Sequence, residues 1–214
     1  MLRLIITTLV LFFAVSVFAQ QERKFQVWNY NSISVNITSK TSISASEKVH
    51  YTPFESGLDL KFGDLWLKHE TCNWFEYSGG FRVLYSRSEN GWIEERRPMI
   101  MGTFSKKIRN FDVSFSHRLE YRFFEFLENH FRYRQKIDIE SPSLTSFGLQ
   151  LFAAEETYTK FNNDRTHLAR FYAGVQTIDK DHFAMKVYYV LEKNKKNYIW
   201  NTADVLGMNL SFRL

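Results

Sequence analysis

Residues 110–122 alternate between two kinds of side chain with almost no interruption. The odd-numbered positions carry Phe, Val, His, Leu or Tyr, and the even-numbered positions carry polar or charged groups. Because successive side chains of a β-strand point to opposite faces, the run predicts a strand with one apolar face and one charged face. Residues 130–140 repeat the pattern. Such strands suit either a sheet with a solvated face or a barrel with a lipid-facing outside and a polar lumen.

The first nineteen residues predict export. Arg3 provides a short positive region, residues 4–18 are almost entirely apolar, and Val17-Phe18-Ala19 resembles a cleavage site before Gln20. No cysteine follows this site, so the pattern is not that of a lipoprotein. We therefore expect a signal peptide over residues 1–19 and a single domain over residues 20–214.

The composition of the remaining chain favours a barrel in a membrane. After residue 19 no apolar run approaches eighteen residues, so no membrane helix is expected. The mean hydropathy is −0.33, yet aromatic residues make up 17% of the chain. A membrane barrel reconciles these values, because only alternate residues of its strands must be apolar. The basic balance, with a pI near 9.2, then indicates contacts with anionic lipid head groups rather than with nucleic acid.

Eleven segments have the pattern of strands, separated by turn-forming residues. They are 26–38, 41–51, 58–69, 74–87, 92–106, 109–124, 130–140, 144–157, 166–178, 182–193 and 199–213. Bacterial barrels of one chain have even strand numbers, so we expect an antiparallel transmembrane β-barrel of about ten strands, with 26–38 surplus. Twelve is the alternative, if 26–38 contains two short strands. The apolar alternation that runs to Leu214 resembles the assembly signal of outer-membrane barrels, so the barrel-assembly machinery is an expected partner.

The predicted inward faces carry eight positive and seven negative side chains: Glu76, Arg82, Glu95, Arg97, Asp112, Arg118, Glu120, Arg122, Arg132, Arg134, Lys136, Asp138, Glu140, Glu155 and Arg170. A selective pore would carry a surplus of one sign, whereas this near balance indicates ion pairs that cross the lumen. The candidate network consists of Glu95, Arg97, Arg118, Glu120, Arg122, Arg132, Arg134, Glu155 and Arg170.

Four arginines of this set, at positions 118, 122, 132 and 134, have only Glu120 as a close acid in the sequence. They could form a pocket for a small anionic ligand that carries a carboxylate, phosphate or sulfate group. Alternatively, Glu95 and Glu155 could come from neighbouring strands and complete the network. The sequence leaves both readings open.

Little in the sequence indicates catalysis. The chain has no Gly-x-Ser-x-Gly motif, no phosphate-binding glycine loop and no metal-ligand spacing, so we expect no cofactor and no metal. The one cysteine, Cys72, excludes an internal disulfide. The strongest catalytic candidate is His130 near Glu128, with Ser114 and Ser116 on the neighbouring strand. His117 falls on the apolar face, where packing is the expected role.

Five short elements occur in the order seen in a family of outer-membrane β-barrels of Gram-negative bacteria, a domain family of unknown function. They are Glu95-Glu-Arg-Arg-Pro98, Arg118-Leu-Glu-Tyr-Arg122, Arg132-Tyr-Arg134, Phe152-Ala-Ala-Glu155 and Arg170-Phe-Tyr-Ala-Gly174. Trp28 also fits the pattern of this family, and the resemblance spans roughly residues 26–214. It implies a barrel in the outer membrane and no established activity.

The sequence thus predicts an outer-membrane barrel with an ion-paired lumen, whose role is structural or is the restricted passage or binding of a small solute. The first alternative is an outer-membrane hydrolase acting on lipid or peptidoglycan fragments. The second is a soluble periplasmic barrel resembling lipocalins, which would place the aromatic residues inside and the charged residues outside.

Overall fold

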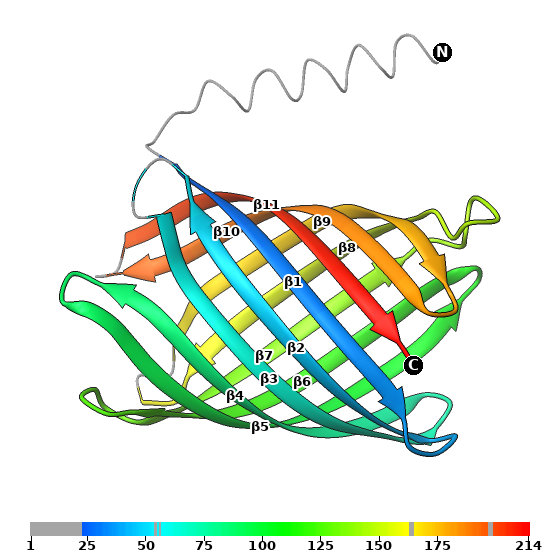
Figure 1. The fold of residues 1–214 in the computed structure, drawn as a ribbon, viewed down its shortest axis with the longest axis horizontal. Coiled ribbons are helices and arrows are strands. Elements are labelled where there is room, and N and C mark those ends of the chain that lie inside the picture. The colour runs from blue at the N-terminus through cyan, green and yellow to red at the C-terminus, as the bar shows by residue number, and fades with distance from the viewer. Residues whose placement is uncertain (1–22, 54, 56, 163–164, 197–198) are drawn as a thin grey trace, which may run out of the picture.

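The computed structural model describes residues 23–214 apart from 54, 56, 163–164 and 197–198, and it shows an all-β barrel (Figure 1). The predicted signal peptide lies outside the described residues. The strands are β1 (Lys24–Asn36), β2 (Thr41–Thr52), β3 (Gly57–Cys72), β4 (Phe75–Ser88), β5 (Gly91–Ile108), β6 (Phe111–Phe124), β7 (His130–Glu140), β8 (Gln150–Lys160), β9 (Arg165–Lys180), β10 (Phe183–Lys196) and β11 (Ile199–Arg213).

The barrel closes between its first and last strands. Each consecutive pair of strands is antiparallel, whereas β1 lies parallel to β11, with Lys24 opposite Ala203 and Ser34 opposite Arg213. One parallel pair allows an odd strand number, so the described residues form eleven strands rather than ten or twelve. The expected all-β barrel is confirmed. The prediction that segment 26–38 is surplus, which assumed an even strand number, is wrong. This segment forms the strand that closes the barrel.

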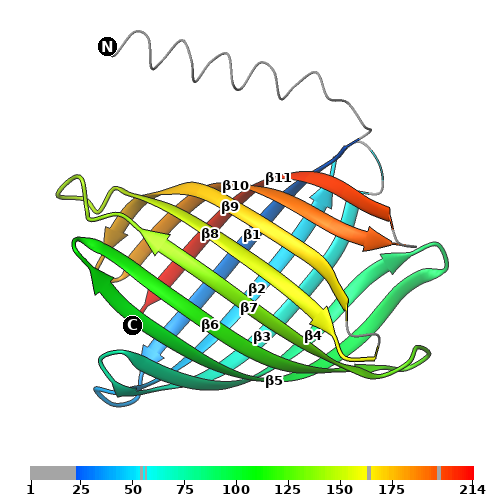
Figure 2. The ribbon, with the colours of Figure 1, turned by 180° about the vertical axis from the view of Figure 1, so that it is seen from behind.

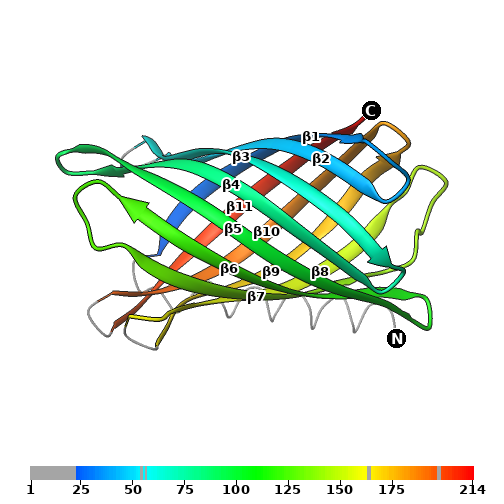
Figure 3. The same ribbon diagram turned by 90° about the horizontal axis from the view of Figure 1, so that it is seen from below.

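The parallel closure places the start of β1 and the end of β11 at opposite ends of the barrel (Figures 1 and 3). We call them the N-terminal end, which holds Lys24 and the turn at 89–90, and the C-terminal end, which holds Leu214 and the turn at 109–110. The loop at 141–149 also lies at the C-terminal end. The strands run obliquely to the barrel axis on both sides of the molecule (Figure 2).

The outer surface is largely apolar. Large exposed hydrophobic side chains occur on every strand face that points outward, including Leu65, Ile100 and Leu206. Exposed aromatic residues gather near both ends of the barrel. Phe25, Trp92, Phe123 and Trp200 lie near the N-terminal end, and Trp74, Phe104, Phe111 and Phe212 lie near the C-terminal end. Two aromatic belts around an apolar band are typical of barrels that cross a membrane.

Two carboxylates interrupt the apolar band. Glu47 on β2 accepts a hydrogen bond from the Asn31 amide at 3.0 Å, and Asn31 also donates to Asn29 at 2.8 Å. Glu155 on β8 is exposed on the outer face, opposite Ile137 of β7 and Phe171 of β9. The described part of the chain contains no helix of the length and apolarity needed to span a membrane.

Inside the barrel, two glycines let large rings lie flat against the wall. A Cβ atom on Gly80 would be 2.5 Å from the Trp66 ring, and one on Gly207 would be 2.2 Å from the Tyr188 ring. Both distances are far below any van der Waals contact, so these rings require glycine beside them. The lumen is therefore filled by side chains packed on its own wall as well as by groups that reach across it.

Candidate functional site

A layer of buried side chains crosses the lumen, and every strand contributes to it. Each of these side chains is at most 9% exposed. We call this set the buried layer: Trp28, His50, Phe62, Leu84, Glu95, Glu120, Arg132, Tyr158, Leu168, Val190 and Val205. A water-filled channel at this level would expose the side chains that line it. Side chains therefore fill most of the lumen at the buried layer.

Glu120 is the acidic centre of the buried layer. Its carboxylate has no exposure and accepts hydrogen bonds from Arg132, at 2.8 Å from Nε and 2.5 Å from Nη2. Arg118 forms an ion pair with the other carboxylate oxygen, and Arg97 approaches to 3.4 Å. Three guanidinium groups from β5, β6 and β7 thus converge on one carboxylate. Planar guanidinium groups suit this role because they bind carboxylates through two N–H groups at once.

Glu95 is the second buried acid of the layer. Arg122 binds it through both carboxylate oxygens, at 2.6 Å from Nε and 2.8 Å from Nη2. Arg97 also binds Glu95, at 2.7 Å, and so links the Glu95 and Glu120 clusters. Four arginines therefore share two glutamates in this region.

A third cluster surrounds Glu156 of β8, which is 1% exposed. Arg134 forms an ion pair with it, Arg170 approaches to 3.6 Å, and the Tyr172 hydroxyl donates a hydrogen bond at 2.7 Å. The sequence assigned this role to the neighbouring Glu155. That assignment is wrong, because Glu155 points outward and Glu156 points into the lumen.

Contacts between strands that are not neighbours show that side chains reach across the lumen. The Arg170 guanidinium of β9 lies 4.8 Å from the Trp28 ring of β1. The Arg118 guanidinium of β6 lies 5.9 Å from the Trp66 ring of β3. Within the same region, Arg132 lies 4.6 Å from the ring of Tyr158. An arginine over an aromatic face is a favourable contact. The rings therefore stabilise arginines whose positive charge the carboxylates do not fully neutralise.

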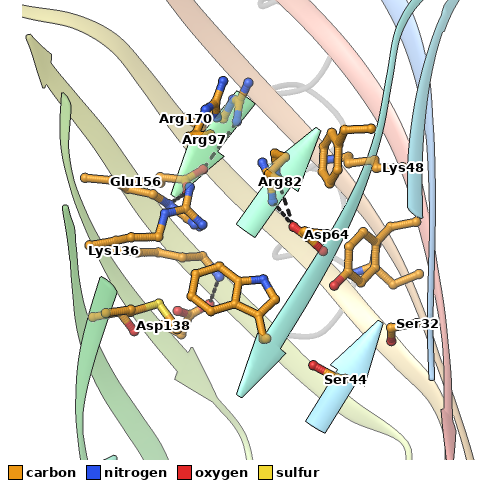
Figure 4. Close-up of a pocket in the computed structure, with 18 of the residues that line it drawn as sticks. Ser32, Ser44, Lys48, Asp64, Arg82, Arg97, Lys136, Asp138, Glu156 and Arg170 are labelled. Carbon is orange, nitrogen blue, oxygen red and sulfur yellow. Dashed lines mark hydrogen bonds and ion pairs between the residues drawn. The ribbon is translucent and has the colours of Figure 1, made fainter. Parts of the chain in front are cut away.

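A cavity of about 750 Å³ extends from the buried layer to the C-terminal end, where Arg213 at its rim is exposed. Figure 4 shows part of its lining. On the β3–β4 side its lining continues to Leu60 and Ser86. Further ion pairs stand in its wall. Arg82 pairs with Asp64 of the neighbouring strand, Lys136 with Asp138, and Lys186 with Glu140 at 2.5 Å.

The charge of the lumen is not balanced. Twelve basic side chains line the cavity: Lys48, Lys68, Arg82, Arg97, Arg118, Arg122, Arg132, Arg134, Lys136, Arg170, Lys186 and Arg213. Six acidic side chains line it: Asp64, Glu76, Glu95, Asp138, Glu140 and Glu156. Two further acids, Glu120 and Glu192, form ion pairs with arginines of its wall. The expected near balance is therefore wrong, and the described lumen carries a surplus of positive charge.

Eight of the nine candidate network residues lie together in the lumen, and only Glu155 does not. Asp112, also predicted to face inward, lies at the C-terminal end and pairs with Lys107 at 3.5 Å, where both side chains are more than half exposed. Seven charged residues of the lumen were not predicted from the sequence: Lys48, Asp64, Lys68, Glu156, Lys186, Glu192 and Arg213. For Asp64 the available signal was its alternation with Leu65 and Leu67, which point outward.

The candidate catalytic set does not assemble. His130 lies opposite Arg122, whereas Ser114 lies opposite Asp138, eight residues away along β6. At about 3.3 Å per residue this separation is roughly 26 Å. His117 is on the outer face, as predicted, and forms a hydrogen bond with Tyr133. Among the described residues, no three His, Cys, Asp or Glu side chains are placed to hold a metal ion.

These features define a class of protein: a closed β-barrel with an apolar outer surface and a lumen crossed by buried ion pairs. The chain belongs to DUF2490, a family of proteins of unknown function, whose model matches residues 25–202. The expectation of a family of unknown function is thus confirmed. No curated protein matches the chain. Among solved structures, the chain is similar to LpxR from Salmonella typhimurium, at 10% identity and a TM-score of 0.49, over 81% of this chain and 83% of that one.

Proposed function

We propose that this protein spans the bacterial outer membrane as an occluded barrel, which retains a small solute in its lumen rather than conducting solutes freely. The observation that carries the proposal is the buried layer, to which all eleven strands contribute and in which no side chain is more than 9% exposed. Ions and nutrients need a continuous water-filled path, as in the wide barrels of porins. The buried layer leaves no wide path of this kind.

The outer surface supports placement in lipid. The shortest strands have 11 residues, which meets the roughly 9–11 residues that a tilted strand needs to cross a bilayer. Exposed Trp and Phe side chains at both ends would lie at the level of the lipid head groups. Membrane lipid is thus one partner of the protein. A soluble barrel would need the opposite arrangement, with aromatic residues inside and charged residues outside. The observed faces therefore favour the membrane over the lipocalin-like alternative.

The buried ion pairs support a rigid, closed lumen. Each buried ion costs several kcal/mol to remove from water, so the pairs form only where geometry and hydrogen bonds compensate. Glu95, Glu120 and Glu156 each have at least two cationic partners. Opening the lumen would separate these partners, which opposes spontaneous opening.

Cell fractionation tests the proposal. We expect the full chain to sediment with the outer membrane and to migrate faster on SDS gels before boiling than after it, because the closed barrel resists detergent. Recovery in the soluble periplasmic fraction, without a heat-dependent shift, would contradict it. A barrel that fractionates with the membrane and conducts ions steadily would contradict the occluded lumen alone.

A further inference from the structure

Lys48 of β2 faces the cavity without a carboxylate partner. Among the described residues no carboxylate oxygen lies within 4.0 Å of its ammonium group, which rests 3.9 Å from the centre of the Trp28 ring. The Arg170 guanidinium lies 4.8 Å from the centre of the same ring. Two cations therefore share one aromatic ring, and this part of the cavity attracts negative charge.

The acids near Lys48 are already engaged. Asp64 accepts hydrogen bonds from Arg82, at 3.0 Å from Nε, and from the Ser46 hydroxyl. Glu192 is bound by Arg170 at 2.7 Å. Each of these carboxylates thus neutralises the charge of an arginine. The positive charge of Lys48 is therefore not neutralised by either of them.

Polar atoms around this positive charge also lack partners. His50 is 8% exposed and lines the cavity, and its Nε2 atom has no hydrogen-bond partner among the described residues. The same holds for the side-chain oxygen of Asn209, which lines the cavity from β11. Buried polar groups are normally hydrogen-bonded, so these atoms indicate that an additional polar molecule completes the site.

One wall of the cavity is rich in hydroxyl groups. Ser32 and Ser44 lie across the cavity from Lys136 and Asp138 (Figure 4), and Ser34, Ser42 and Ser211 continue the same wall. Trp66, Phe152 and Tyr172 add aromatic faces. Hydroxyls bind polyols through hydrogen bonds, and flat rings pack against the apolar faces of sugars. The volume of about 750 Å³ lies within the roughly 300–1,000 Å³ of small-molecule sites.

We infer that the cavity binds a small anionic sugar, whose phosphate or carboxylate group lies at Lys48 and whose hydroxyl groups contact the serine wall. The inference rests on the proposed function, since an occluded lumen can retain a solute that an open pore would release. It adds the class of that solute and the residue that recognises its charge. Phosphate and carboxylate groups both carry the negative charge that Lys48 recognises. The test below shows which of the two groups is bound more tightly.

Titration calorimetry of the full chain in detergent micelles tests the inference, with inorganic phosphate, glucose, glucose 6-phosphate and galacturonate as probes. We expect glucose 6-phosphate or galacturonate to bind about tenfold more tightly than inorganic phosphate, and glucose to give no measurable heat. The tighter of the two acidic sugars identifies the anionic group. Equal affinities for glucose and both acidic sugars, or no binding of any probe, would overturn the inference.

Three variants locate the site. Lys48→Met should weaken binding of the acidic sugar at least about tenfold, and Lys48→Arg should restore most of it, because the charge returns. Lys61→Met is the matched control, since Lys61 lies on the outer face near Tyr85 and Trp92 and should leave binding unchanged. Equal affinities of Lys48→Met and Lys61→Met would overturn the assignment to Lys48.

A further variant keeps the test decisive if Lys48→Met loses the gel shift of a folded barrel. Ser44→Val should keep the affinity for inorganic phosphate and lower the affinity for the acidic sugar, because it removes a hydroxyl of the wall and no charge. An unchanged affinity for the acidic sugar would overturn the role of the wall. A closed, membrane-bound barrel that binds none of the probes would contradict this inference and leave the proposed function intact.

Discussion

The fully buried carboxylate of Glu120 accepts two hydrogen bonds from the guanidinium of Arg132, at 2.8 Å from Nε and 2.5 Å from Nη2. The two residues face each other across the β6–β7 pair. Arg97 and Arg118 complete the same cluster. Three buried arginines therefore share Glu120, and Arg97 among them also pairs with Glu95.

The first prediction concerns the charge of Glu120. Glu120→Gln keeps the shape of the side chain and leaves three arginines without their shared carboxylate. Breaking a buried ion pair typically costs roughly 3–5 kcal/mol, so the free energy of unfolding should fall by about that amount. Urea unfolding of the protein in lipid vesicles, followed by tryptophan fluorescence, measures it. Glu94→Gln is the control, because Glu94 pairs with the exposed Arg96 on the outer face. Equal unfolding midpoints for the two variants would refute the role of Glu120.

The second prediction concerns the packing of the lumen wall. Gly80→Ala would place a Cβ atom 2.5 Å from the Trp66 ring and 2.9 Å from the Leu65 carbonyl oxygen. Overpacking of this kind costs about 1–3 kcal/mol, so we expect a lower unfolding midpoint and a shifted tryptophan emission. Gly79→Ala is a matched control on the adjacent residue, where an added Cβ meets no atom within 4 Å. The prediction is wrong if both variants unfold alike.

The third prediction concerns the orientation of the barrel across the membrane. With Cys72 changed to Ser, Asn90→Cys and Asn110→Cys each place one thiol in an exposed turn, at the N-terminal and the C-terminal end of the barrel respectively. If the C-terminal strand ends in the periplasm, a maleimide that cannot cross membranes should label position 90 in intact cells. Position 110 should react only after lysis. Labelling of both positions in intact cells would contradict a barrel that spans the membrane.

Much of the barrel could be predicted from alternation, because a two-residue period fixes which face each side chain joins. All eleven segments correspond to strands, and the Arg118–Arg122 motif lies in the lumen as expected. The strand number could not be predicted from parity. Whether the first strand closes against the last in a parallel or an antiparallel direction depends on tertiary packing, such as the burial of Trp28, and local sequence does not encode it.

The misplaced Glu155 has a local cause. The predicted strand 144–157 begins too early, because residues 141–149 form a loop in which the Leu144 amide bonds to the Leu149 carbonyl and Gly148 has a φ of 86°. Ala153 and Ala154 are both small, and Glu155 and Glu156 are both acidic, so the sequence does not mark the inward face. Lys48 was missed for a related reason, since three small serines precede it on the inward face of its strand and alternation is weak there.

Ion conductance tests the central claim most directly, because it reports whether the buried layer interrupts the lumen. We predict that the purified chain, shown by flotation to be inserted in vesicles, gives no steady conductance steps in planar bilayers. A Tyr158→Gly and Trp28→Gly double variant, which removes two large rings of the buried layer, should produce steps if it retains the heat-dependent gel shift. Steady conductance by the unaltered protein would contradict the occluded barrel.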